Sequence, residues 1–120
     1  MEKIIITCKN CDASLTNQLK KIKLDLSLFE EDEEIIERGF WSEGHEDVSI
    51  SHNDRILINW RDSKLINHKL IKNYFGCCGY EPVDFLNQIC PNCKIGIATI
   101  VNECYTYDYV AIKVENVKVK

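Results

Sequence analysis

Long apolar runs are missing from this chain of 120 residues. No run approaches the ~20 residues of a membrane-spanning helix. The isoleucine run at residues 4–6 is also shorter than the ~7–15 apolar residues of a signal peptide. The sequence therefore predicts no membrane association and a cytoplasmic location.

Clustered positive charge is scarce as well. The formal net charge is −4, and the one basic cluster comprises Lys20, Lys21 and Lys23, which we interpret as a solvated helix face. Proteins that bind nucleic acid need clustered Lys and Arg side chains to displace the counterions of the phosphate backbone. The sequence therefore predicts no nucleic-acid partner.

The signatures of common enzyme classes are missing too. The chain contains no GxSxG, no phosphate-binding loop, no HExxH and no paired-carboxylate pattern. His45, His52 and His68 are scattered and do not stand at ligand spacing from one another. A catalytic Cys–His pair can meet in space without being close in sequence, but nothing in the chain indicates one. We expect a protein that is not an enzyme.

Proline is rare, with only Pro82 and Pro91, and no linker rich in Pro, Gly or Ser interrupts the chain. No internal repeat of the solenoid kind is present. A length of 120 residues is enough for one hydrophobic core. We therefore expect a single domain that spans residues 1–120.

Hydrophobic periodicity predicts an α+β fold, with an antiparallel sheet and two or three short helices. Residues 3–7 and the last thirty residues predict strands, and alternation around residues 48–50 and 55–60 predicts a hairpin. Spacing and capping residues predict the helices: from Asp12 or Ser14 to Lys23, with Leu15, Leu19 and Ile22 on one face; from Leu28 to Arg38, stopped by Gly39; and from Asp62 or Ser63 to Tyr74.

Cysteine, by contrast, is abundant, with seven in the chain. An odd number without a signal peptide argues against a disulfide framework and favours metal or catalytic chemistry. Two C-x2-C pairs stand out, Cys8 with Cys11 and Cys90 with Cys93. A spacing of two residues lets the backbone turn so that both sulfurs face one point, and two such knuckles supply four thiolates, each ~2.3 Å from a zinc ion.

We therefore predict a structural zinc site formed by Cys8, Cys11, Cys90 and Cys93, which makes the chain a zinc-binding domain of zinc-ribbon-like type. A closed shell of four thiolates leaves no open position for a substrate. The two pairs stand near opposite ends of the chain, whereas those of compact zinc ribbons are ~15–20 residues apart. The metal would tie the first strand to the start of the C-terminal sheet, so its binding energy would be folding energy.

The other cysteines leave alternatives open. Cys77, Cys78 or Cys104 could replace one of the four ligands or serve a second metal, although neighbouring side chains in an extended chain point opposite ways. A thiol oxidoreductase or redox sensor that uses Cys8 and Cys11 is the main alternative, because a helix after a C-x2-C pair lowers the pKa of its first thiol. A third hypothesis is a zinc or redox sensor that uses Cys77 and Cys78.

Acidic residues cluster in EEDEEIIE, residues 30–37. We interpret this run as a solvated helix face, or as a docking surface for a basic partner. Together with the small size of the chain, it suggests a partner protein such as a basic toxin domain, which an immunity protein would neutralise. The sequence does not indicate an oligomeric state.

The cysteine motifs resemble those of a group of small bacterial proteins to which no activity is assigned. The matching stretches cover most of the chain: Cys8 and Cys11, LINWRD at residues 57–62, GCCG at residues 76–79, NQICPNC at residues 87–93, and Glu103-Cys104-Tyr105. The chain departs from the group where YEPVDFL replaces a glycine-rich segment and where Glu103-Cys104-Tyr105 replaces Asp-Cys-Trp. The resemblance implies a shared fold with bound metal. We expect a non-catalytic, zinc-stabilised bacterial protein that acts by binding another macromolecule.

Overall fold

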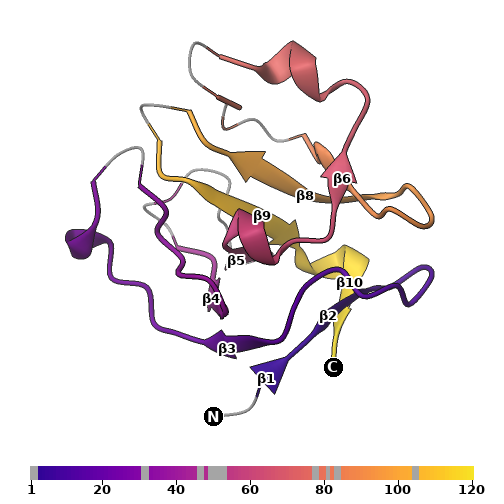
Figure 1. Ribbon diagram of the computed structural model, residues 1–120, viewed down its shortest axis with the longest axis horizontal. Helices are drawn as coiled ribbons and strands as arrows, with labels where there is room; N and C mark the ends of the chain where they lie inside the picture. The colour runs from indigo at the N-terminus through magenta and orange to yellow at the C-terminus, as the bar shows by residue number, and fades with distance from the viewer. Residues whose placement is uncertain are drawn as a thin grey trace.

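Short β-strands, joined by extended segments and single turns of 3-10 helix, make up the computed structural model (Figure 1). It describes residues 3–30, 33–45, 48, 54–76, 79–80, 82, 85–103 and 106–120. Within these ranges, eight strands form one mixed sheet in the order β1-β3-β4-β5-β9-β8-β7-β6, and β2 pairs with β10 in a separate ribbon. Neighbouring strands are antiparallel except β3 and β4, which run parallel.

The elements have the following bounds. The strands are β1 (Lys3–Ile4), β2 (Ile6–Cys8), β3 (Leu19–Lys21), β4 (Phe40–Glu43), β5 (Arg55–Ile58), β6 (Ile66–Asn67), β7 (Gln88–Ile89), β8 (Gly96–Val101), β9 (Tyr109–Lys113) and β10 (Val117–Val119). The 3-10 turns are η1 (Leu26–Leu28), η2 (Trp60–Asp62), η3 (Ile71–Tyr74) and η4 (Val114–Asn116).

The α+β prediction is wrong, because the described part of the chain contains no α-helix and is mostly β. Nor does that part hold any helix long and apolar enough to cross a membrane. In place of the first predicted helix the chain is largely extended and forms β3. Leu15 and Leu19 enter one core cluster, while Ile22 packs against another. Their helical spacing therefore reflects an extended segment that serves two sides of the core.

In the described part of the chain the other two predicted helices are absent as well. Between residues 28 and 38 the backbone pairs with a distant segment, since the Ile35 amide donates to the Asp108 carbonyl at 3.4 Å and the Asp108 amide donates to the Glu33 carbonyl at 2.8 Å. Between residues 62 and 74 the chain forms only the end of η2, the edge strand β6 and the single turn η3. Tertiary packing thus overrides the local helix signals at both places.

Two core clusters lie on opposite faces of the central strands β5 and β9. Ile56 and Ile58 belong to the first cluster, whereas Leu57 between them belongs to the second. This alternation follows from the two-residue period of a strand. The members of the first cluster are Ile6, Cys8, Leu15, Leu19, Ile56, Ile58, Cys90, Ile97, Ala98, Val110, Ile112 and Val117. Those of the second are Ile35, Ile36, Val48, Leu57, Val101, Tyr109 and Ala111.

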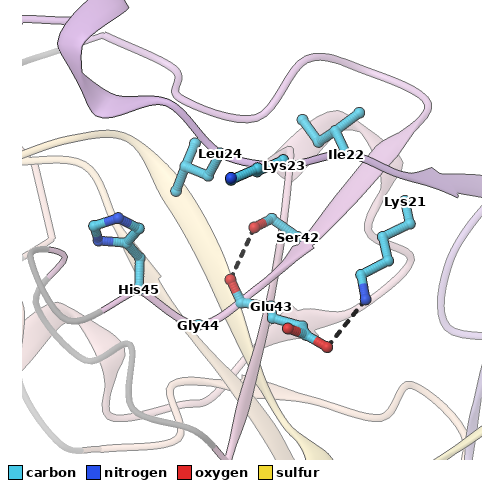
Figure 2. A pocket seen from close by; sticks show the side chains of 8 residues that line it. All are labelled: Lys21, Ile22, Lys23, Leu24, Ser42, Glu43, Gly44 and His45. Atoms are coloured by element: carbon cyan, nitrogen blue, oxygen red, sulfur yellow. Dashed lines mark hydrogen bonds and ion pairs between the residues drawn. The ribbon is translucent and has the colours of Figure 1, made fainter.

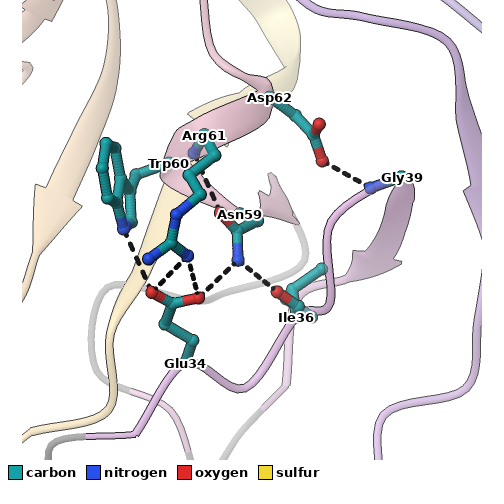
Figure 3. Close-up of polar contacts among 7 residues, drawn as sticks. All are labelled: Glu34, Ile36, Gly39, Asn59, Trp60, Arg61 and Asp62. Atoms are coloured by element: carbon teal, nitrogen blue, oxygen red, sulfur yellow. Dashed lines mark hydrogen bonds and ion pairs between the residues drawn. The ribbon is translucent and has the colours of Figure 1, made fainter.

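The η2 turn holds residues 33–38 in place, and Ile35 and Ile36 of this segment belong to the second cluster (Figure 3). We call residues 33–38 the covering segment. Glu34 accepts hydrogen bonds from the side chains of Asn59 and Trp60. It also forms an ion pair with Arg61, in which Nη1 of Arg61 contacts both carboxylate oxygens of Glu34. The Asn59 amide also donates to the carbonyl of Ile36 at 2.9 Å. The conformation of this covering segment is thus fixed by side chains of the NWRD stretch, not by helix formation.

Several of the predicted strands are present, unlike the predicted helices. The first strand and the C-terminal strands are confirmed, the latter as β8, β9 and β10. The second half of the predicted hairpin is β5, and its antiparallel partner is β4 at Phe40–Glu43. Val48 is buried in the second cluster, while residues 49–53 lie outside the described part of the chain.

Candidate metal centre

The two C-x2-C pairs form backbone turns of the same design. In the first, the Cys8 amide donates to the Ala13 carbonyl at 2.8 Å, and the Asp12 amide donates to the Cys8 carbonyl at 2.8 Å. In the second, the Cys90 amide donates to Ile95 and the Lys94 amide to Cys90, each at 3.0 Å. The same two bonds recur in the same register, so each pair presents its sulfurs in the same way.

A left-handed residue completes each turn. Asp12 has φ of 61° and Lys94 has φ of 67°, a region that few residues other than glycine occupy. Each follows directly after the second cysteine of its pair and reverses the chain into the extended segment beyond. We call the two turns the N-terminal knuckle, residues 8–13, and the C-terminal knuckle, residues 90–95.

The four sulfurs meet at one place. The Sγ atoms of Cys8 and Cys93 lie 3.6 Å apart, as do those of Cys11 and Cys90, and all four lie within 4.8 Å of one another. Sulfurs at the corners of a tetrahedron around zinc are about 3.8 Å apart when each Zn–S bond is ~2.3 Å. The cysteines are free thiols. They form a cluster that can hold a metal ion.

Burial divides the cluster into an inner and an outer pair. Cys8 and Cys90 are fully buried and belong to the first core cluster, whereas Cys11 and Cys93 are partly exposed. Burial raises the pKa of the Cys8 thiol to about 12, against the opposing effect of the amides of Cys11 and Asn10. A buried thiolate is costly without a nearby cation, and a bound metal supplies one and removes the proton.

The outer thiols have the opposite tendency. A hydrogen bond from the Asn10 side chain, followed by one from the Ile95 amide, lowers the pKa of Cys93 to about 6. The Asn92 side chain, followed by the Ala13 amide, likewise lowers the pKa of Cys11. Each asparagine thus serves the second cysteine of the opposite knuckle. Donors that favour the thiolate are what a metal-binding sulfur requires.

The predicted ligand set is brought together as expected. Among the described residues, no further group of three or more Cys, His, Asp or Glu side chains is arranged to hold a metal. The suggested substitutes Cys77, Cys78 and Cys104 lie outside the described part of the chain. Asn10 and Asn92 were not predicted as part of the site, although the shared pattern C-x-N-C of the two knuckles was a signal.

A separate groove lies between the chain segments that leave β3 and β4 (Figure 2). It has a volume of about 860 Å³. Lys21 is paired with Glu43 at 3.1 Å, and the Ser42 hydroxyl donates to the Glu43 carbonyl at 2.8 Å. The side chains of Lys21, Ser42 and Glu43 are thus engaged within the chain. Its lining comprises Lys21, Ile22, Lys23, Leu24, Ser42, Glu43, Gly44 and His45 and includes none of the four cysteines.

Comparison with known proteins adds no relative. No family model, curated protein or solved structure matches the chain. The resemblance to a group of small bacterial proteins therefore stays a prediction, and the four-cysteine cluster is the basis for a functional argument.

Proposed function

We propose that Cys8, Cys11, Cys90 and Cys93 hold one structural Zn²⁺ ion, and that the protein acts by binding another macromolecule. The observation that carries the metal proposal is the convergence of four free thiols whose sulfurs all lie within 4.8 Å of one another. Four protein ligands fill the coordination shell of zinc, which leaves no position for a substrate or an activated water. The ion would then support the fold and take no part in a reaction.

Zinc is the metal that the donor set favours. Soft thiolates select zinc, copper(I) or iron over magnesium and calcium, and four sulfurs in a tetrahedron suit zinc or iron. Zinc binding involves no change of oxidation state, as expected of an ion that only supports the fold. An iron ion in the same shell is the competing outcome, and metal analysis separates the two directly.

The alternative, a thiol oxidoreductase, has less support. It was predicted from a helix N-terminus that would lower the pKa of the first thiol, but the chain after Cys11 turns back through Asp12 into an extended segment. Burial raises the pKa of Cys8 instead, and its sulfur lies 3.6 Å from that of Cys93, on the other knuckle. Metal binding accounts for all four cysteines, whereas the redox hypothesis accounts only for Cys8 and Cys11.

Metal analysis of purified protein tests the site. We expect one zinc per chain in the wild type, and less than a fifth of that in Cys11→Ser and Cys90→Ser, because loss of either thiolate opens the shell. Cys77→Ser, Cys78→Ser and Cys104→Ser are matched controls that should keep the full zinc content. Loss of metal in one of these controls, with retention in Cys11→Ser, would contradict the assignment of ligands.

We further propose that the partner is a basic protein, such as a toxin domain that this chain neutralises. Support comes from the net charge of −4 and from the acidic segment at residues 30–37. Within it Glu30, Glu33 and Glu37 are exposed. Glu34 is held by η2, and its charge is matched by Arg61. The exposed carboxylates remain to attract a partner of opposite charge over about 10 Å at moderate salt.

Charge reversal tests this choice of surface. The variant changes Glu30, Glu33 and Glu37 to lysine, and a matched control changes Glu43, Asp54 and Glu115, which are exposed acids elsewhere in the chain. Immobilised protein is incubated with lysate of the producing cells, and retained proteins are identified by mass spectrometry. We expect a basic protein to be retained by the wild type and the control but lost from the variant. Equal retention by all three would refute the acidic surface.

A further inference from the structure

We propose that the groove beside β3 and β4 binds an extended peptide as an additional strand, with an acidic side chain of the peptide opposite Lys23. The groove has a volume of about 860 Å³, within the range of ~300–1,000 Å³ that is typical of ligand sites. The inference goes beyond the proposed function, because it concerns a different surface and does not depend on a bound metal. It also gives a role to the basic cluster at residues 20–23, which the proposed function leaves unused.

The pairing between β3 and β4 ends early, and the groove begins where it ends. The last backbone bond between them is donated by the Ile22 amide to the Trp41 carbonyl at 2.9 Å. In the described part of the chain, no further backbone hydrogen bond joins the two segments beyond it. Residues 22–24 and residues 42–45 then line the two sides of the groove (Figure 2). The groove is therefore the space between two separating strands.

Unpaired backbone groups face this space. Exposure alternates along residues 21–26 as it does in a strand, and backbone groups two residues apart in a strand face the same neighbour. The Ile22 amide faces β4, so the amide and carbonyl of Leu24 do as well. The Trp41 carbonyl faces β3, so the Glu43 amide does as well. Among the described residues these groups of Leu24 and Glu43 have no partner, and such groups are a template for a further strand.

The side chains of the groove determine which peptide fits. Ile22 and Leu24 are partly buried against the second cluster, so an added strand would place apolar side chains beside them. Lys23 lies between them in the chain and is exposed. It forms no ion pair with a described residue, whereas Lys21 is paired with Glu43 at 3.1 Å. Opposite charges on neighbouring strands stabilise a sheet, and we therefore expect a peptide with the pattern apolar–acidic–apolar.

Synthetic peptides test the inference on the full-length protein. The probe is acetyl-Thr-Val-Glu-Val-Thr-amide, and binding is followed by the amide signals of ¹⁵N-labelled protein in NMR spectra. One control peptide replaces its Glu by Lys, and another carries methyl groups on its three central backbone nitrogens. We expect the probe to shift the amide signals of Leu24 and Glu43. The lysine peptide should bind at least about tenfold more weakly because like charges meet, and the methylated peptide should not bind, since backbone hydrogen bonds supply the affinity of an added strand.

Protein variants test the charge assignment. Lys23→Glu should weaken binding of the probe by about tenfold, whereas Lys64→Glu, at an exposed position outside the groove, is the matched control and should leave it unchanged. Glu43→Gln should tighten binding, because it removes a carboxylate from the groove and releases Lys21. A gain in affinity does not result from unfolding, so this variant keeps the test valid even if Lys23→Glu is unstable.

Three results would overturn the inference: no binding of the probe by the wild type, equal affinity for the acidic and lysine peptides, or undiminished binding of the methylated peptide. Each would leave the proposed zinc site and the acidic surface intact, because the groove contains neither the four cysteines nor residues 30–37.

Discussion

Ile5 and Lys120 exchange two backbone hydrogen bonds, with N···O distances of 3.0 Å and 2.9 Å. The exchange continues the β2/β10 ribbon, in which Val117 lies opposite Cys8. Backbone pairing therefore holds the strand that carries the first cysteine against the C-terminal strand (Figure 1). A metal ion held by the four cysteines would be a second tie across the same region.

Metal removal should loosen the two halves of the core to different extents. The first cluster contains Cys8 and Cys90, whereas the second contains no metal ligand. After chelation we expect the amides of Cys8 and Cys90 to lose hydrogen-exchange protection by at least tenfold. Leu57 and Ala111, which are partners in the β5/β9 pair, should remain protected. Uniform loss of protection would show that the fold depends on the metal throughout.

Truncation of a central side chain tests the second cluster without touching the cysteines. Leu57 is fully buried, and Leu57→Ala should lower the free energy of unfolding by about 2–5 kcal/mol, since it removes packing and leaves a cavity. Leu28 is 73% exposed, so Leu28→Ala is the matched control, with a change below about 0.5 kcal/mol. Urea unfolding of metal-loaded protein measures both. Similar values for the two would contradict the assignment of the core.

The Glu34 network predicts a pH dependence of stability. Burial opposes ionisation of Glu34, but hydrogen bonds from Asn59, Arg61 and Trp60 outweigh it and lower its pKa from the ordinary value of 4.5. A carboxylate with a lowered pKa stabilises the fold above its unfolded pKa, and this contribution is lost as pH falls through the folded pKa. The stability difference between wild type and Glu34→Gln should therefore be constant above pH 6 and shrink below 4.5. A difference that grows on acidification would refute this.

Gly79 should tolerate no side chain. A Cβ at this position would lie 2.3 Å from the backbone oxygen of Asn102, and the Tyr80 amide next to it bonds the Asn102 side chain at 2.5 Å. Gly79→Ala should destabilise the protein by about 1–3 kcal/mol or more, because overpacking against backbone forces the chain to move. Gly39→Ala is the comparison, since a Cβ there meets nothing within 4 Å and only the φ of 87° is unfavourable. Thermal unfolding should rank Gly79→Ala as the worse variant.

The four-cysteine cluster was predictable because its spacing signal is local. Two residues between thiols are enough to specify a knuckle, whatever the rest of the chain does, and so Cys8, Cys11, Cys90 and Cys93 could be paired from spacing alone. The role of Asn10 was not predictable in the same way. Asn10 lowers the pKa of Cys93 on the other knuckle, and nothing in a single turn indicates which sulfur an asparagine will affect.

The fold was harder to predict because its strands are only two to six residues long. A period of two is weak over so few residues, while a chance spacing such as Leu15 and Leu19 imitates a helix. The covering segment shows the same limit. Its conformation depends on Glu34 reaching Asn59 and Arg61 on a distant turn, and local propensity contains no information about that contact.

Zinc-edge X-ray absorption of the purified, metal-replete protein identifies and counts the ligands of the bound ion. We predict a single shell of four sulfur atoms at about 2.3 Å from zinc, with no nitrogen or oxygen ligand, and loss of one sulfur in Cys11→Ser. A shell with three sulfurs or fewer in the wild type, or one that is unchanged in Cys11→Ser, would contradict it.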